Sequence, residues 1–338
     1  MEDDTSWLPA ELAPVALRLA RADQAAYQLS ELTLNWSRGA EDRGALDLVE
    51  VLTDAGNLDL VVAGIRPIPP LVPMLFSEAV HHLRAAIENT LFHLVESSRG
   101  AKIPDKQALA IQMPVHQDQQ SFEDWQTKAA KRGIIELAAG TKLGNRVAHL
   151  QPCADKSAVP SIDPELAALM GVQPHYAHPM VLLQKYSNTD KHHAIRMAAS
   201  RGVVQRHDEP FFGSDRSMRP IEVGDVLTTT RPGTPVVVDA SMAVHVLRPD
   251  DAVWVAPARE LDHLYRHVCN TVIPSLVTGF ALTKSLPPQI ELGDTGDCDS
   301  ERIRHGGWQS AYERMAAVTD GAYHQSLTTA PQFPTRRT

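Results

Sequence analysis

The feature that most constrains the fold is a long helical pattern in the first third of the chain. Between Met74 and Glu96, apolar residues recur at every third or fourth position, and four prolines lie directly before this segment. Such spacing places the apolar side chains on one face of a helix, while the prolines mark its beginning. The stripe comprises Val80, Leu83, Ile87, Leu91 and Leu94. A helix of this length buries its apolar face against other elements, so the segment predicts a helical core.

Similar patterns predict further helices, and a different pattern predicts a hairpin. Two segments rich in Val, Leu and Ile, Leu46 to Thr53 and Leu58 to Ile65, flank the turn-forming cluster Asp54 to Asn57. This arrangement is typical of a β-hairpin. The other expected helices are Pro9 to Trp36, Phe122 to Arg132, Thr141 to Leu150, Asp163 to Met170 with Ser161 or Asp163 as its cap, His178 to Ala199, and Ala258 to Leu282.

The character of the sequence changes after residue 200. From Val203 to Val255, runs rich in Val and Thr alternate with Pro and Gly turns, which predicts an antiparallel meander with Thr228, Thr230 and Arg248 on an exposed polar face. The fold class is therefore α+β, with a mainly helical core, an N-terminal β-hairpin and a C-terminal antiparallel sheet. We expect three regions: a mainly helical domain at 1–200 with the hairpin at 46–65, strands plus a helix at 201–285, and a loosely ordered tail at 286–338 that includes one short docked helix at 308–318.

Charge and cysteine content restrict the class of protein. The net charge is -9, which argues against a surface that binds nucleic acid everywhere, although Trp125 to Arg206 carries a net +6. This asymmetry suits either a local anion site or a solvated basic face. The three cysteines are few and widely spaced, and we find neither a signal peptide nor a long apolar run, so we expect a reduced, cytoplasmic protein without a membrane partner.

Three segments together resemble a known family. They are His81 to Asn89, then Leu150-Gln151-Pro152, then Tyr186 to His192. In this order they are similar to an uncharacterised bacterial and phage family, common in actinobacteria, in which an N-L-R-S-A-L-D-H helix precedes an L-S-N-x-D-K-H-R helix. The resemblance implies a shared fold and a phage or defence context. This sequence departs from the family pattern at Asn89, where the family has His, and at His193, where it has Arg.

The first of these segments also has a distant HEPN-like character. In HEPN-type ribonucleases an Arg and a His on one helix act on a phosphodiester, and the corresponding positions here are Arg84 and Asn89. Arg can stabilise phosphate charge and imidazole can move a proton near neutral pH, whereas Asn cannot act as a general base. Under this reading Arg84, His93 and His192 are the candidate catalytic residues, with His193 as a further candidate for the proton shuttle.

A binding role explains the same residues without catalysis. Arg84 and Glu88 form an i,i+4 pair, and Asp190 is a candidate partner for Arg84 in a network between helices. The candidate binding residues are Glu88, Asn89, Asn188, Asp190, Lys191 and His193. Such a cluster suits a small anion, a nucleotide or a protein partner, and a satisfied junction between helices is the structural alternative.

A metal reading and several enzyme classes find little support in the sequence. Glu78-x-x-His81 and Glu260-x-x-His263 have the spacing of di-iron bundles, but the abundance of Glu and His produces such pairs by chance. Motifs for P-loop, Rossmann, hydrolase-elbow and zinc-protease sites are missing from the sequence. We therefore expect no metal and no cofactor, and a non-enzymatic binding or interaction protein with an RNA, nucleotide or protein partner or a second copy. The alternative is a metal-independent HEPN-like ribonuclease, degenerate at Asn89, so whether the chain is an enzyme stays open.

Overall fold

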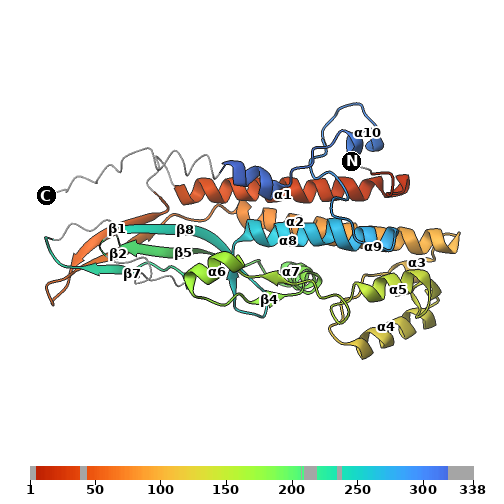
Figure 1. Ribbon diagram of the computed structural model, residues 1–338, viewed down its shortest axis with the longest axis horizontal. Coiled ribbons are helices and arrows are strands. Elements are labelled where there is room, and N and C mark those ends of the chain that lie inside the picture. Colours follow the sequence, from red (N-terminus) through yellow and green to blue (C-terminus); the bar gives the residue numbers. More distant parts are fainter. Residues whose placement is uncertain (1–4, 39–43, 207, 209–218, 234–237, 319–338) are drawn as a thin grey trace.

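Two long helices and one shorter helix form the centre of the molecule. The computed structural model describes residues 5–38, 44–206, 208, 219–233 and 238–318. Helices α1 (Ala13–Arg38), α2 (Leu71–Arg99) and α8 (Pro257–His267) pack side by side along the long axis, with the strands at one end and α4 and α5 at the other (Figure 1). None of the helices among the described residues is long and apolar enough to cross a lipid bilayer.

Shorter elements complete the architecture. Further helices among the described residues are α3 (Asp105–Ala108), α4 (Gln119–Lys131), α5 (Lys142–His149), α6 (Pro164–Met170), α7 (Pro179–His192), α9 (Ile273–Val277), α10 (Asp299–Arg304) and a last segment at 311–318. Two 3-10 helices lie at Ala10–Leu12 and Ile135–Leu137, and a π-helix at Val268–Val272 joins α8 to α9. The strands are β1 (Leu46–Leu52), β2 (Leu58–Ile65), β3 (Val159–Pro160), β4 (Tyr176–Ala177), β5 (Met197–Arg206), β6 (Arg219–Pro220), β7 (Val226–Thr230), β8 (Val238–Leu247) and β9 (Trp254–Val255).

The α+β prediction is confirmed, including the hairpin and the antiparallel strands. Strands β1 and β2 pair with Val49 opposite Val61, and β7 adds to the free side of β2 to give the order β1-β2-β7. The second sheet has the order β6-β5-β8-β9, and β3 pairs with β4 in a separate two-stranded ladder. Every pairing between the described strands is antiparallel. The hairpin is therefore part of a sheet that also contains a strand from the second half of the chain.

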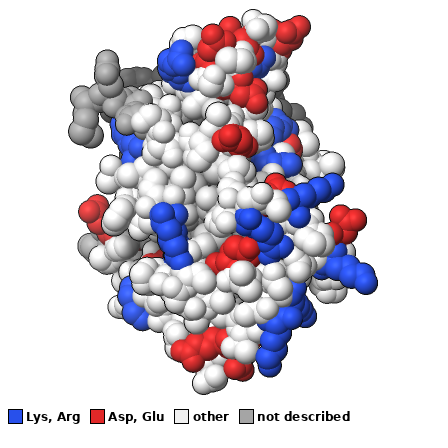
Figure 2. All heavy atoms as spheres, turned by 90° about the vertical axis from the view of Figure 1, so that its right-hand side faces the viewer, with Lys and Arg blue, Asp and Glu red and all other residues white. Residues whose placement is uncertain are grey.

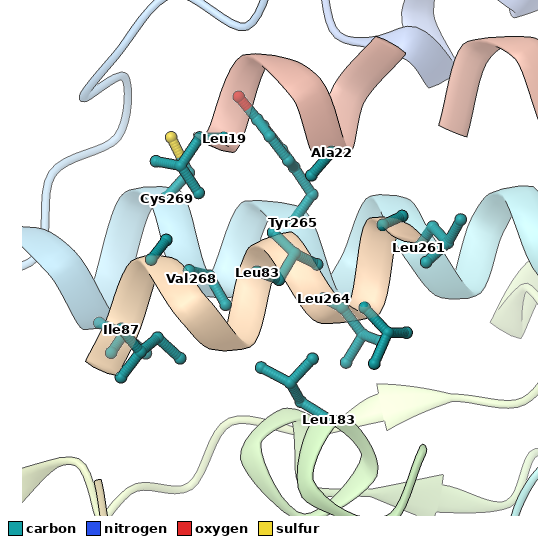
Figure 3. Close-up of a cluster of buried hydrophobic side chains, with 14 of the residues drawn as sticks. Leu19, Ala22, Leu83, Ile87, Leu183, Leu261, Leu264, Tyr265, Val268 and Cys269 are labelled. Atoms are coloured by element: carbon teal, nitrogen blue, oxygen red, sulfur yellow. The ribbon is translucent and has the colours of Figure 1, made fainter. Parts of the chain in front are cut away.

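The core is built from the apolar faces of the central helices. Leu19 of α1, Leu83 and Ile87 of α2, Leu183 of α7 and Leu264 of α8 belong to one cluster of buried side chains (Figure 3). Of the apolar stripe predicted for α2, Val80, Leu83, Ile87 and Leu91 are buried in this cluster, and Leu94 is partly buried against it. Helices α2 and α7 pack together as expected, and the rings of Phe76 and Tyr186 meet edge to face with centroids 5.0 Å apart.

Two expectations about local structure are wrong. The helix expected to reach Ala199 ends at His192, and the apolar residues after Ile195 form β5, because Met197 pairs with Val246 of β8. Arg248 was expected on an exposed face, but its side chain is 0% exposed, because it forms an ion pair with buried Glu260.

The segment after residue 285 differs from the expected loose tail over 286–318. Leu286, Ile290, Ile303 and Ala311 are buried in the main core cluster. The short helix expected at 308–318 is present at 311–318. Arg314 also forms an ion pair with Asp23 of α1 at 2.7 Å. The expectation for 319–338 lies outside the described residues. The boundary expected at residue 201 stays a prediction, and this core cluster draws residues from both sides of it.

Candidate functional site

Arg84 and Glu88, predicted as a pair on one helix, together hold the backbone of a residue far along the chain. The Arg84 Nη2 atom lies 2.5 Å from a Glu88 carboxylate oxygen and donates to the Met113 carbonyl at 2.7 Å. The Met113 amide in turn donates to Glu88 Oε2 at 2.7 Å. Burial raises the pKa of Glu88, although the charges of Arg84 and Lys191 and the Met113 amide oppose this effect. The pair fixes the segment that follows α3 against α2.

We call the contacts of Arg84 and Glu88 with the Met113 backbone the Met113 clamp. The other predicted site residues lie apart from this clamp or on the surface. Asn89 is exposed on α2, and the half-buried His93 has its Nε2 atom 3.2 Å from the Ser97 hydroxyl. The C-terminal end of α7 carries the exposed residues Asn188, Asp190, Lys191 and His192, and the C-cap His193 that follows is also exposed. Lys191 is near enough to act on the charge of Glu88. Within the described residues, Arg84 forms an ion pair with Glu88 and not with Asp190.

A hollow of about 390 Å³ lies beside the C-terminal end of α2. Its lining includes Arg99, whose guanidinium donates to both carboxylate oxygens of Glu136, to Gln107 and to the Gly133 carbonyl. Every nitrogen of this side chain therefore has a partner, and none is directed at a ligand. Lys and Arg are interspersed with Asp and Glu on this end of the molecule (Figure 2). This face presents no patch of a single sign of charge.

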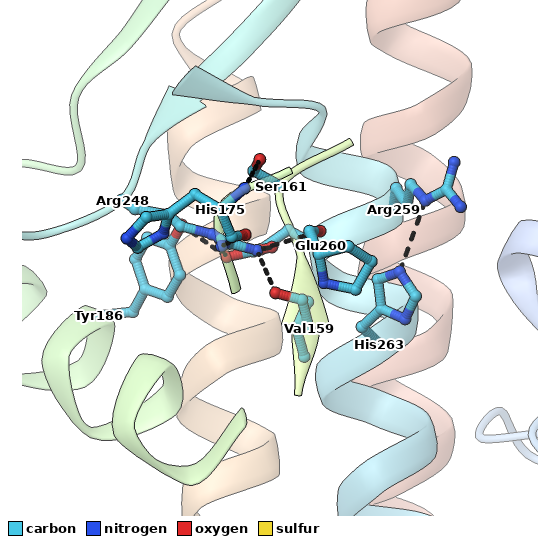
Figure 4. A network of polar contacts seen from close by, with 9 residues as sticks. Val159, Ser161, His175, Tyr186, Arg248, Arg259, Glu260 and His263 are labelled. Atoms are coloured by element: carbon cyan, nitrogen blue, oxygen red, sulfur yellow. Dashed lines mark hydrogen bonds and ion pairs between the residues drawn. The ribbon is translucent and has the colours of Figure 1, made fainter. Parts of the chain in front are cut away.

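A fully buried ion pair links the second sheet to α8. Arg248, directly after β8, contacts both oxygens of Glu260, at 2.9 and 2.8 Å, and Tyr186 donates to the same carboxylate at 3.1 Å (Figure 4). Arg248 also donates to the carbonyls of Val159, Pro160 and His175, on and beside β3 and β4. His263, one turn after Glu260, has its Nε2 atom beside Arg259 instead. Glu260 and His263 therefore do not face a common ion.

The strongest convergence of chemically active groups is formed by Asp155, His178 and His267. One ligand atom from each lies within 4.8 Å of the other two, and the three side chains are 16%, 10% and 7% exposed. His178 Nε2 is 3.2 Å from Asp155 Oδ2, and His267 Nε2 is 3.9 Å from the same oxygen. The two imidazole rings meet edge to face with centroids 5.6 Å apart.

Each member of this triad has a fixed position for a local reason. Asp155 Oδ1 accepts the amide and hydroxyl hydrogens of Ser157, an Asx-turn that orients the carboxylate. His178 is the N-cap of α7, and its Nδ1 atom accepts the Met180 amide hydrogen at 3.1 Å. His267 is the last residue of α8, directly before the π-helix. Single π-turns within helices are frequent at functional sites.

Protonation in the triad follows from these contacts. Because Nδ1 of His178 is an acceptor, the proton of the neutral ring is on Nε2, which donates it to Asp155. Burial lowers the pKa of His178, and it lowers the pKa of His267 to about 4 despite the opposing charge of Asp155. Burial would raise the pKa of Asp155, but the two hydrogen bonds from Ser157 and the two imidazoles outweigh it and lower that pKa. At neutral pH the triad comprises one carboxylate and two neutral imidazoles.

The sequence analysis did not identify this triad. Its members lie 23 and 89 residues apart and belong to three different elements, so no local spacing connects them. The His178-Pro179 dipeptide at the beginning of a helix was the one local signal, and it indicates only an N-cap. No family model, curated protein or solved structure matches this chain, so the resemblance to the bacterial and phage family stays a prediction.

Proposed function

We propose that this chain is a non-enzymatic interaction protein that binds an extended, basic segment of a partner protein along strand β1. The observation that carries the proposal is the exposure of this strand. Six of its seven residues are exposed, including Leu48 (40%), Val49 (44%), Val51 (45%) and Leu52 (66%). Because side chains alternate along a strand, both faces of β1 present apolar groups to solvent.

Strand β1 is also an edge strand. In the part of the chain that the structure describes, its sheet has the order β1-β2-β7, so one side of β1 pairs with β2 and the other side is open. An open edge offers backbone amides and carbonyls to a further strand, and proteins usually protect such edges with lysine, proline or a covering segment. Strand β1 carries two acids, Asp47 and Glu50, and a bulge between Asp47 and Leu48, but no lysine or proline. An exposed edge with several apolar side chains is typical of a surface that binds an extended peptide by strand addition.

The charge of the hairpin favours a particular partner. Between Leu46 and Ile65 there are four acidic residues, Asp47, Glu50, Asp54 and Asp59, and no Lys or Arg. This net charge of -4 opposes pairing with the hairpin of a second copy and disfavours nucleic acid. A strand that alternates apolar and basic residues would satisfy both the exposed apolar groups and the carboxylates.

The helical polar cluster offers less support for binding, and no observation favours the ribonuclease alternative. The Arg84 guanidinium already contacts Glu88 and Met113, and His93 contacts Ser97 rather than Arg84. A phosphodiesterase needs an arginine and an imidazole that converge on one open cleft. A reducing, intracellular location fits the proposal, since Cys153, Cys269 and Cys298 are free thiols.

A peptide-binding experiment tests the proposal. The probe is a fluorescein-labelled octapeptide of alternating valine and lysine, compared by anisotropy with its valine–glutamate counterpart at low and high salt. We expect the basic peptide to bind at least about tenfold more tightly, a difference of about 1.4 kcal/mol, and to weaken with salt. The double variant Asp47→Lys/Glu50→Lys should reverse the preference.

Controls make the outcome specific to β1. The variant Glu123→Lys/Asp124→Lys makes the same charge change at two exposed acids of α4 and should bind like the parent. Circular dichroism checks that each variant is folded. Equal binding of both peptides, or no binding of the basic one, would contradict the proposal. A dimer in light scattering that the β1 variant dissociates would show that the occupant is a second copy instead.

A further inference from the structure

We propose that Asp155, His178 and His267 bind one divalent first-row transition metal ion of the zinc class. Two imidazole nitrogens and one carboxylate oxygen are a ligand set that such ions prefer. The three atoms belong to the turn after α5, the N-cap of α7 and the end of α8. An ion at this position would add a further link among three elements already connected by the bond between Asp155 and His178 and by the bond from Tyr186 of α7 to Glu260 of α8. The inference is independent of the function proposed for β1.

The state of His267 points to a missing partner. Its Nε2 atom is buried and has no hydrogen-bond partner among the described residues, although it faces Asp155 Oδ2 at 3.9 Å. That separation is too long for a hydrogen bond. Buried polar atoms are nearly always satisfied, so an orphaned imidazole nitrogen directed at a carboxylate calls for a ligand between them. A metal ion would accept the lone pair of the nitrogen and bridge it to the carboxylate.

The separations suit an ion after a small contraction. A tetrahedral zinc ion with bonds of about 2.0 to 2.1 Å holds its ligand atoms about 3.3 to 3.4 Å apart. The distance between His178 Nε2 and Asp155 Oδ2 is already 3.2 Å, and His267 Nε2 would have to approach Asp155 from 3.9 Å. The ligand atoms of the two imidazoles lie within 4.8 Å of each other and would also have to reach this spacing. The second oxygen of Asp155 is held by Ser157, as the outer shell of a metal site usually requires.

Metal binding makes one specific demand on His178. Its Nε2 atom now carries the proton, because Nδ1 accepts the Met180 amide hydrogen. To bind a metal through Nε2, the ring must move this proton to Nδ1, and the Met180 amide then loses its acceptor. The shift releases no net proton. Binding at this site should therefore change the environment of one backbone amide, that of Met180, in a way that binding elsewhere would not.

The experiment is a titration of the metal-free full chain with Zn²⁺ alone, by chelator competition, with Co²⁺ as a spectroscopic probe. We expect one ion per chain, a higher melting temperature and a visible Co²⁺ spectrum of nitrogen and oxygen ligands. His267→Gln and Asp155→Asn should each weaken Zn²⁺ binding at least about 100-fold. Matched controls are His149→Gln, which removes an exposed imidazole, and Cys153→Ser/Cys298→Ser, which removes the two accessible thiols. Both should bind like the parent.

A second readout applies even where a variant fails to fold. In parent protein labelled with ¹⁵N-methionine, Zn²⁺ should shift the Met180 amide resonance, which Met180→Leu identifies. The proposal is overturned if the parent binds no Zn²⁺ at micromolar concentration. It is also overturned if folded His267→Gln and Asp155→Asn bind Zn²⁺ as tightly as the parent, or if Zn²⁺ binds and the Met180 resonance stays unchanged.

Discussion

Replacing Arg248 with Met tests the buried ion pair that joins the second sheet to α8. Arg248 and Glu260 are 0% and 1% exposed, and Arg248 makes two bonds to the carboxylate and three to backbone carbonyls. Met has a similar length but no charge and no donor. Arg248→Met therefore leaves the carboxylate of Glu260 buried with one remaining bond, from Tyr186.

The size of the stability loss follows from the groups that Arg248→Met leaves without a partner. Breaking a buried pair by removing one member typically costs about 3 to 5 kcal/mol, because the other charge remains desolvated. Arg248→Met should lower the free energy of unfolding by this amount, at the upper end because three carbonyls also lose their donor. The double variant Arg248→Met/Glu260→Met removes both charges and should recover most of the loss. Tyr186→Phe removes one bond and should cost only about 1 kcal/mol.

Urea denaturation at pH 7, followed by circular dichroism, measures these differences. The matched control is Arg259→Met, because Arg259 forms a partly exposed ion pair with Asp163, and such pairs contribute little to stability. Two results would refute the reasoning: a cost for Arg248→Met no larger than that of Arg259→Met, or a double variant as unstable as the sum of its two single variants.

Three further predictions concern other buried or partly buried charges. Burial lowers the pKa of His245 to about 4. As pH falls, the His245 imidazole of the folded protein therefore becomes protonated at a lower pH than the same imidazole of the unfolded chain. Stability should decrease between pH 7 and 5 by about 2 kcal/mol more in the parent than in His245→Phe, and equal slopes in urea titrations would contradict this. Arg84→Met should cost about 1 to 3 kcal/mol by releasing Met113, whereas a melt like that of the parent would mean that the clamp contributes nothing. Arg314→Met should cost about 2 to 3 kcal/mol, since Asp23 is only 3% exposed, while Arg219→Met, whose ion pair with Asp225 is partly exposed on both sides, should change stability by less than about 0.5 kcal/mol; similar melts would count against the pairing.

Elements defined by local sequence could be predicted well. The prolines and the apolar stripe located α2, the turn at Asp54 to Asn57 located the hairpin, and Asp163 caps α6 as expected. Each of these depends on neighbours within a few residues, which sequence periodicity and turn chemistry report directly.

Features that depend on distant partners could not be predicted in this way. The residues after Ile195 continue an apolar pattern that fits a helix, but pairing of Met197 with Val246 makes them a strand. In the sequence, Arg248 has the context of a surface residue beside a turn. It is buried because its partner Glu260 lies in the core, which the sequence does not reveal. The triad is the extreme case, because His178 and His267 are neighbours only through the packing of α7 against α8.

The buried ion pair and the triad are connected through the same short ladder. Arg248 holds the carbonyls of Val159 and Pro160 in β3 and of His175 just before β4. Asp155 lies four residues before β3, and His178 directly follows β4, so this anchor sets the positions of both side chains.

Helix α8 carries the other half of the arrangement. Glu260 precedes His267 by seven residues, two turns along the same helix face. The ion pair between Arg248 and Glu260 therefore fixes the ladder that carries Asp155 and His178 against the helix that carries His267. If the triad binds zinc, Arg248→Met should weaken that binding even at temperatures where the variant is fully folded, although it changes no ligand. Arg259→Met, on the same helix, should leave zinc affinity unchanged, and an equal effect of both variants would show that Arg248 does not position the triad.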